Sequence, residues 1–128
     1  MSLEFPVERD PLTEKVIGCA IEVHRHLGPG LLEITDESAL CHEFKISGLD
    51  FRRQAAFPVL YKGTPVGEYR VDLLIAECLI VELKSVERIE PLFEAQLLAY
   101  LKISGCKRGL LLNFNSRLLK DGIKRFIL

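Results

Sequence analysis

The sequence of 128 residues lacks tryptophan, has a single methionine and contains no long run of apolar residues. A helix that spans a membrane needs about 20 mostly apolar residues, so the sequence predicts no transmembrane segment. The first 15 residues, MSLEFPVERDPLTEK, are acidic and lack the apolar centre of a secretory signal. We therefore expect a cytoplasmic protein.

Cysteine motifs are also missing. The four cysteines are far apart, and none forms a C-x-x-C pair or a Cys/His pair at zinc-binding spacing. Most lie in apolar segments, which favours buried, reduced thiols. They are Cys19, Cys41, Cys78 and Cys106.

A strong net charge is absent as well, since the formal net charge is only −1. Residues 101–128 nevertheless carry seven basic side chains and one acid, Asp121. Such a surface can bind an anionic partner, although ordinary solvated charge explains it equally well. The candidate nucleic-acid-binding residues are Lys107, Arg108, Arg117, Lys120 and Lys124.

The length suits one domain over residues 1–128, in which residues 1–10 form a loose lead-in. Apolar spacing and Gly/Pro punctuation predict the elements. The first helix begins at Pro11–Thr13, with Thr13 as its cap, and ends at Leu27. It is followed by a helix over 31–46, strands over 51–61, 66–75 and 78–86, and a helix over 91–104. The last elements are a strand over 107–114 and an edge strand over 123–128. Pro58 places the first long strand at an edge or a bulge. A hairpin meander followed by a helical crossover predicts an α/β fold with a mixed central sheet flanked by helices.

Three charged residues lie in the apolar hairpin YRVDLLIAECLIVELKSVE, residues 69–87. A three-residue turn at 76–78 makes the numbers of opposed residues sum to 154, so Asp72 lies across from Glu82. Glu82 and Lys84 share one face because they are two apart in a strand. By the same rule Val71 and Leu73 lie together on the opposite face.

Two opposed carboxylates inside a sheet need neutralisation. Lys84 can supply it, or a divalent cation can bind between the oxygens, and hard oxygen ligands suit Mg²⁺ or Mn²⁺. This arrangement favours metal-assisted hydrolysis of a phosphodiester, in which Lys84 orients water or stabilises phosphate charge. The same D-x(9)-E-x-K pattern also occurs by chance on hairpins whose charged face is simply solvated.

Polar residues on two helices accompany the hairpin. Gln96 and Tyr100 are four apart on an otherwise apolar helix, so they share a face that can reach a polar site. Glu33 lies in the first turn of its helix, where the helix dipole favours a carboxylate whatever its function.

Asp72 followed by Glu82-Leu83-Lys84 resembles the signature of the PD-(D/E)xK nuclease superfamily, and Gln96-xxx-Tyr100 resembles the motif of its helicase-associated exonuclease branch. More closely, residues 12–125 resemble the GxxExxY family. The matching phrases are LTEKVIGCAIEVHRHLGPGLLE, VDLLI, IVELKSVE, EAQLLAYLK and LLLNFNSRLLKDGIKR. The one departure is Asp36, which stands where the family name requires tyrosine. If that tyrosine stacks on or bonds to substrate, this chain lacks the contact. If it only packs, Asp36 is a surface change.

The resemblance implies a restriction-endonuclease-like fold with core order αβββαβ and an extra N-terminal helix. It implies that Asp72, Glu82 and Glu33 are metal ligands, that Lys84 is the catalytic lysine, and that Gln96 and Tyr100 support the site. The leading hypothesis is a Mg²⁺- or Mn²⁺-dependent nuclease acting on DNA rather than RNA. Because the small core has few elements to grip a duplex, a homodimer or a partner is expected.

Two other hypotheses stay open. One is a catalytically silent nuclease-fold module that binds nucleic acid or a protein, and its binding would survive the loss of metal. The other is a phosphohydrolase of small nucleotides or an assembly subunit, since fold alone does not decide activity.

Overall fold

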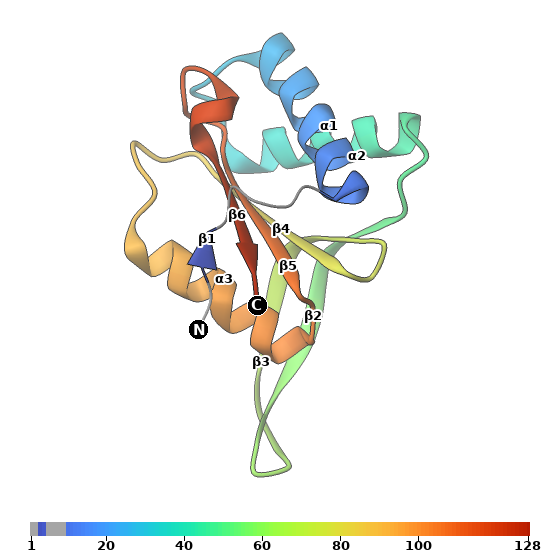
Figure 1. Ribbon diagram of the computed structural model, residues 1–128, viewed down its shortest axis with the longest axis vertical. Helices are drawn as coiled ribbons and strands as arrows, with labels where there is room; N and C mark the ends of the chain where they lie inside the picture. The colour runs from blue at the N-terminus through green and yellow to red at the C-terminus, as the bar shows by residue number, and fades with distance from the viewer. Residues whose placement is uncertain (1–2, 5–9) are drawn as a thin grey trace.

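A computed structural model of the chain describes residues 3–4 and 10–128 and shows a mixed sheet between two layers of helices (Figure 1). The strand order is β1-β6-β5-β4-β3-β2. The strands are β1 (Leu3–Glu4), β2 (Phe51–Tyr61), β3 (Thr64–Ile75), β4 (Leu79–Lys84), β5 (Arg108–Asn113) and β6 (Ile123–Ile127). The helices are α1 (Pro11–Leu27), α2 (Glu33–Ile46), α3 (Pro91–Ser104) and the short 3-10 helix η1 (Leu119–Gly122). The predicted element order, including the extra N-terminal helix, is confirmed.

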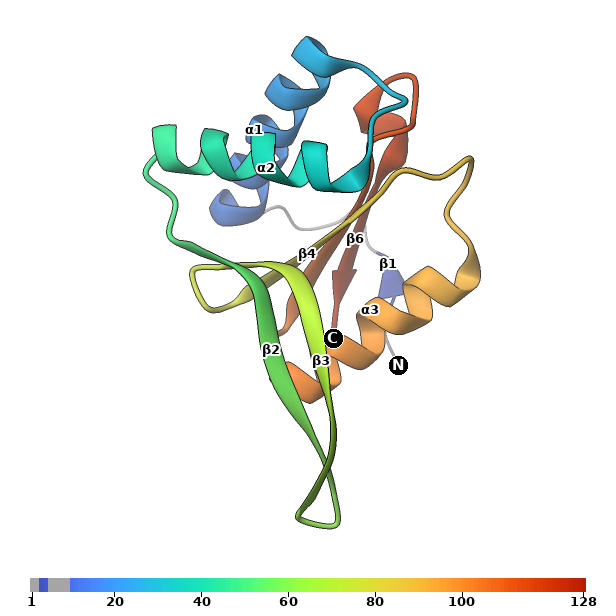
Figure 2. The same cartoon turned by 180° about the vertical axis from the view of Figure 1, so that it is seen from behind.

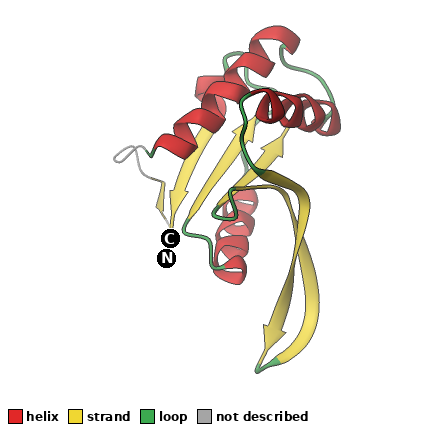
Figure 3. Ribbon diagram, turned by 90° about the vertical axis from the view of Figure 1, so that its right-hand side faces the viewer, coloured by secondary structure: helices red, strands yellow, loops and turns green. Residues whose placement is uncertain are grey.

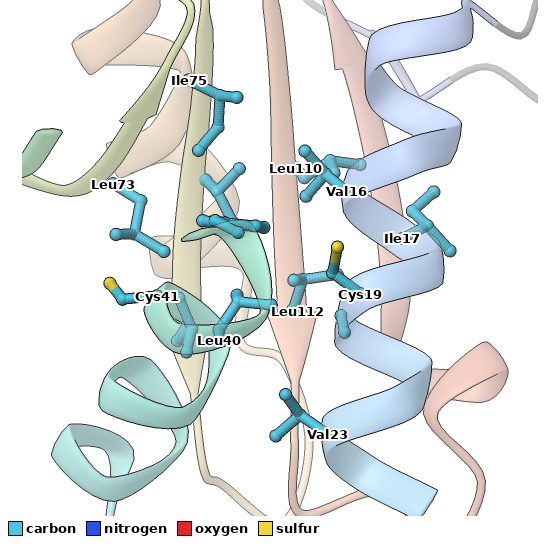
Figure 4. Packing of buried hydrophobic residues seen from close by; sticks show 14 of the residues in the cluster. Val16, Ile17, Cys19, Val23, Leu40, Cys41, Leu73, Ile75, Leu110 and Leu112 are labelled. Atoms are coloured by element: carbon cyan, nitrogen blue, oxygen red, sulfur yellow. The ribbon is translucent and has the colours of Figure 1, made fainter. Parts of the chain in front are cut away.

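The helices divide the hydrophobic core in two. Helices α1 and α2 cover one face of the sheet and α3 covers the other (Figure 3). The first core, shown in Figure 4, joins α1 and α2 to Leu73, Val81 and Leu110. The second core joins α3 to Leu74, Ile80 and Leu111. Because alternate residues of β3, β4 and β5 fill opposite cores, these strands are apolar on both faces.

Strands β2 and β3 form a long hairpin that projects beyond the two helix layers (Figure 2). Its turn places Lys62 and Gly63 at positive φ, as two-residue hairpin turns require. β2 is an edge strand, and its pairing with β3 shifts between Val59 and Leu60. Pro58 therefore lies on an edge strand, as predicted, next to an irregularity in the pairing.

The second hairpin has the predicted register. Leu73 pairs with Val81 and Ile75 with Leu79, and each pair sums to 154. Strand β4 then pairs in parallel with β5 through the α3 crossover. The end of β4 consequently lies in the middle of the sheet, between the two cores.

Several details differ from the sequence prediction. The α1 cap is Asp10, whose carboxylate accepts hydrogen bonds from the backbone N–H and the hydroxyl of Thr13, so Thr13 is not the cap. Cys78 is exposed because it lies in the β3–β4 turn, whereas the other three cysteines are buried. β6 is not an edge strand, since it pairs with β5 and with β1.

The predicted loose lead-in lies mostly outside the described residues; its described part includes β1, which pairs with β6. In the described part of the chain, no helix is long and apolar enough to cross a membrane.

Candidate active site

Strands β3 and β4 separate at the predicted site. Their ladder ends at the pair Leu73–Val81, after which β4 continues to Lys84 beside β5 while β3 stays with β2. We call this point the strand split. It leaves one edge of β4 without a partner strand at Glu82 and Lys84.

At this point the β3 side chains that had faced the second core begin to face the first core, so the strand exchanges its two faces. Leu73 packs in the first core, but Val71, two residues earlier, packs in the second. In a regular strand these residues would share a face, so the prediction that they lie together is wrong. Gln54, opposite Asp72, has a φ of 49°, and this left-handed residue accompanies the exchange. Asp72 therefore lies where the strand turns over.

Asp72 and Glu82 close the strand split with their side chains. The backbone N–H of Asp72 donates to Glu82 Oε2 at 2.6 Å, and the backbone N–H of Leu83 donates to Asp72 Oδ2 at 2.9 Å. Each carboxylate thus accepts the backbone hydrogen bond that a carbonyl of the facing strand would accept if the ladder continued. These two bonds fix both side chains beside each other, close to the cross-strand position that the register predicts.

The Glu82 carboxyl is buried, with 7% of the residue exposed. Burial, and then the charge of Asp72, raises the pKa of Glu82 to about 8 against an ordinary value of 4.5. The N–H of Asp72 and the charge of Lys84 oppose this shift only partly. The raised pKa of this buried acid indicates that the positive charge nearby does not neutralise the two carboxylates.

Lys84 is the last residue of β4 and lies on the same face as Glu82. Its ammonium stands 4.5 Å from the centre of the Phe93 ring on α3. This cation–π contact holds the ammonium at the rim of the second core. There its charge lowers the pKa of Glu82.

Of the two predicted residues on α3, Tyr100 reaches the site. Burial, followed by the charges of Glu82, Tyr69 and Asp72, raises the pKa of the Tyr100 phenol. Its ring packs against Tyr69 of β3 with centroids 5.5 Å apart. Gln96 is exposed, and no hydrogen bond of its side chain is found among the described residues.

Two acids of α2 approach the site from the first-core side. Glu33 accepts a hydrogen bond from the N–H of Ser85, the residue after Lys84, at 3.1 Å. Glu37 is closer to the carboxylate pair, because Gln54 Nε2 donates to both Glu37 Oε1 and Asp72 Oδ1 and because the Glu37 charge acts on Glu82. Glu37 also pairs with Arg53 at 2.9 Å.

The structure therefore brings Asp72, Glu82, Lys84 and Tyr100 together, but it does not bring Glu33 into contact with the two carboxylates. Among the described residues, no three His, Cys, Asp or Glu side chains converge as a metal cluster.

The carboxylate pair nevertheless fits a divalent cation. Each carboxylate uses one oxygen for a backbone N–H, and the second oxygen of Asp72 has only a long, 3.4 Å bond from Gln54. The oxygens that are left are hard donors of the kind that Mg²⁺ and Mn²⁺ prefer. A cation would also neutralise the Glu82 charge that burial disfavours.

Comparison with known proteins decides the family. The model of the PD-(D/E)XK nuclease superfamily matches residues 10–126. The chain belongs to the PD-(D/E)XK nuclease superfamily. No curated protein and no solved structure matches it. Membership of this nuclease superfamily and the order of helices and strands agree on a restriction-endonuclease-like α/β fold.

Asp36 does not lie on the surface. It is buried, with 1% of the residue exposed, so the expectation of a surface change at this position is wrong. Its Oδ1 has no hydrogen-bond partner, and burial raises the pKa of this carboxyl, partly countered by His24.

The predicted basic residues do not form one surface. Arg108 pairs with Asp10 and Lys124 with Glu94, so both serve intramolecular ion pairs. Arg117 and Lys120 lie together on the loop and 3-10 helix after β5, and Lys107 lies just before the opposite end of that strand.

Sequence reasoning missed Glu37, Gln54 and Tyr69. Glu37 follows Glu33 by four residues and so shares its helix face, which was an available signal. Gln54 lay opposite Asp72 in the β2–β3 hairpin, but only the registers of both hairpins together reveal that. Nothing in the local pattern marked Tyr69.

Proposed function

We propose that this chain is a Mg²⁺- or Mn²⁺-dependent nuclease that hydrolyses phosphodiester bonds at the strand split, with DNA as its preferred substrate. The observation that carries the proposal is the exchange of backbone hydrogen bonds that fixes Asp72 beside the buried Glu82. Superfamily membership supports the reaction class. We also propose that, within the superfamily, the chain is a member of the GxxExxY family that its sequence resembles.

Asp72 and Glu82 would hold the cation through their remaining oxygens, with Glu33 as the third acid. When bound, the cation lowers the pKa of a water molecule and polarises the phosphoryl group. Lys84, kept at the rim by Phe93, stabilises the negative charge that grows on the phosphate. Tyr100 stays protonated because its pKa is raised, so its hydroxyl can donate a hydrogen bond to the same phosphate.

The decisive test combines metal titration with cleavage. Calorimetric titration of Mn²⁺ should show saturable binding to the wild type and none to Glu82→Ala. Cleavage of plasmid, single-stranded DNA and RNA should fall at least about 100-fold in Glu82→Ala. Glu68→Ala is the matched control, because Glu68 lies on β3 but is exposed and pairs with Arg70. Cleavage that persists in Glu82→Ala would reject the proposal.

A second experiment assigns the third acid. Glu33→Gln and Glu37→Gln each remove one charge from the same face of α2. Glu33→Gln should weaken Mn²⁺ binding about tenfold, whereas Glu37→Gln should mainly lower stability by breaking its bonds to Arg53 and Gln54. A larger loss of Mn²⁺ affinity in Glu37→Gln would transfer the role to Glu37.

A catalytically silent nucleic-acid-binding module is the alternative function. The absence of a three-acid cluster among the described residues favours it. This alternative predicts binding that depends on salt, survives EDTA and Glu82→Ala, and is never accompanied by cleavage.

A further inference from the structure

A cleft of about 600 Å³ lies between the C-terminal end of α1 and the segment that follows β5. Its lining is largely apolar and includes Ile21, Leu118 and Leu119. Three basic side chains, Arg25, Arg117 and Lys120, line it, and none of the described residues that line it is acidic. We call it the basic cleft. Its volume falls in the range of sites that enclose a small organic ligand.

Two of these cations are available to a ligand. Arg25 already pairs with Glu22 at 2.5 Å. Arg117 and Lys120 are exposed, and neither side chain has a hydrogen bond or an ion pair within the described part of the chain. In contrast, Arg108, Lys124 and Arg125 of the same basic segment are all paired with acids. The cleft therefore offers two unneutralised charges beside apolar lining residues, which matches the phosphate and base of a nucleotide.

The segment that carries these charges is firmly held. His24 Nε2 lies 2.8 Å from the carbonyl oxygen of Ser116, and because a carbonyl can only accept, this ring nitrogen carries the proton. Gly122, the last residue of η1, packs against the end of β5. A Cβ at this position would lie 2.6 Å from the carbonyl oxygen of Asn113, so glycine is required. Arg117 and Lys120 therefore project from a fixed segment and not from a loose loop.

The same segment connects the basic cleft to the strand split. Lys84 is the parallel partner of Asn113, and the N–H of Phe114 donates to the carbonyl of Lys84 at 2.8 Å. Asn113 and Asn115 both donate to the carbonyl of Val86. Arg117 is four residues beyond Asn113, so its Cα lies at most about 14 Å from that of Asn113. Each strand of a duplex rises about 3.4 Å per nucleotide, so this span is at most about four nucleotides.

A second hollow lies along this route. Its volume is about 580 Å³, and its lining includes Glu33, Ser85 and Asn115. Ser85 directly follows Lys84, and Asn115 precedes Arg117 by two residues. A strand that leaves the carboxylate pair therefore has a surface depression to follow towards the basic cleft.

We propose that the basic cleft binds one nucleotide of the substrate strand, a few nucleotides from the scissile bond. Arg117 and Lys120 contact its phosphate, and its base packs against the apolar lining residues Ile21, Leu118 and Leu119. This inference rests on the proposed nuclease function, which it deepens by naming where the uncut part of the strand is held.

The test measures binding without cleavage. Fluorescence anisotropy of a labelled 12-nucleotide oligo-dT, in EDTA and at several salt concentrations, should show weaker binding by Arg117→Ala/Lys120→Ala, by about tenfold or more. The slope of log affinity against log salt should become shallower by about two, one unit for each lost phosphate contact. Lys15→Ala/Lys102→Ala removes the same charge from exposed positions on α1 and α3 and should bind within about twofold of the wild type. Equal losses in both double variants, or no loss in either, would overturn the inference.

Methyl NMR provides a readout that needs no variant. Oligo-dT should shift the methyl signals of Ile21, Leu118 and Leu119 at saturation, and free dTMP should shift the same signals only at far higher concentration. If dTMP binds as tightly as the oligonucleotide, the cleft is a mononucleotide site and the strand assignment fails.

Failure of the inference can be told apart from failure of the proposed function. If the Arg117/Lys120 variant binds and cuts like the wild type while Glu82→Ala does not cut, the nuclease stands and the cleft assignment falls. If no variant and not even the wild type cuts, but the cleft variant loses binding, the cleft stands and the nuclease proposal falls.

Discussion

The backbone N–H of Asp72 donates to Glu82 Oε2 across 2.6 Å, at the point where the ladder between β3 and β4 has ended. The carboxylate of Asp72 in turn accepts from the residue after Glu82. Two acids thus complete a sheet where backbone carbonyls would otherwise do so. This arrangement keeps a buried carboxyl group at the site despite its cost in solvation.

Glu82 should make the stability of the protein fall with rising pH. Its folded pKa, about 8, exceeds the ordinary 4.5 because of burial and of the Asp72 charge. Its stabilising contribution is therefore fully present below pH 4.5 and is lost as pH rises to about 8. Glu82→Gln keeps an acceptor for the Asp72 N–H but cannot ionise.

The measurement is urea unfolding in EDTA at pH 5 and pH 8.5. The wild type should lose on the order of 4 kcal/mol relative to Glu82→Gln over this range, at about 1.4 kcal/mol per pKa unit. A parallel pH dependence of the two proteins would show that Glu82 is not the group responsible.

Metal binding should compete with the proton on Glu82. Because a cation needs the ionised carboxylate, Mn²⁺ affinity should rise nearly tenfold per pH unit from pH 6 to about 8 and then level off. Calorimetry at pH 6, 7, 8 and 8.5 measures this slope. An affinity that does not change over this range would mean that Glu82 is not a ligand.

Phe93 should act on the reaction through Lys84. Phe93→Leu keeps the apolar packing but removes the ring face that holds the ammonium, a contact worth about 0.5–2 kcal/mol. We expect kcat to fall about 2- to 30-fold with unchanged Mn²⁺ affinity. Lys84→Met should lower cleavage about 100-fold, to a residual rate that can still be measured, and in that background Phe93→Leu should have no further effect. Additive losses in the double variant would separate the two residues.

Asp36 should be a source of instability at neutral pH. Burial raises its pKa and leaves Oδ1 without a partner, so its ionised form is disfavoured in the folded state. The stability it contributes is present below its ordinary pKa of 3.8 and is lost as pH rises. Asp36→Asn should therefore be more stable than the wild type at pH 7 by about 1 kcal/mol.

This gain should shrink towards pH 4, where the wild-type carboxyl becomes protonated. Thermal unfolding at both pH values measures it. Asp121→Asn, which changes an exposed acid on η1, is the control and should show no such trend. A variant less stable than the wild type at pH 7 would contradict the prediction.

Local patterns predicted much of the fold. The span of β2 and the end of α3 agree with the sequence prediction because Gly, Pro and apolar spacing act within a few residues. The register of the β3–β4 hairpin follows from the length of one turn. For that reason the chain's own numbering was enough to pair Asp72 with Glu82.

Other features needed several elements at once. The face exchange at Gln54 and Asp72 breaks the alternation on which strand prediction relies. Glu37 reaches the site only because α2 crosses the sheet there. Asp36 was expected to be a surface change if the tyrosine it replaces only packs, yet packing of α2 near His24 buries it.

The amino-acid sequence alone predicts the core of the proposed site: the acids Asp72 and Glu82, their register, and Lys84 on the same face as Glu82. Strand periodicity and turn length are local, so the chain encodes them directly. Tertiary packing instead determines that the ladder ends just before this pair, that Glu33 bonds to Ser85 while Glu37 approaches the carboxylates, and that Arg117 and Lys120 line a cleft. These relationships arise where separate helices and strands meet, and no single stretch of sequence encodes such a meeting.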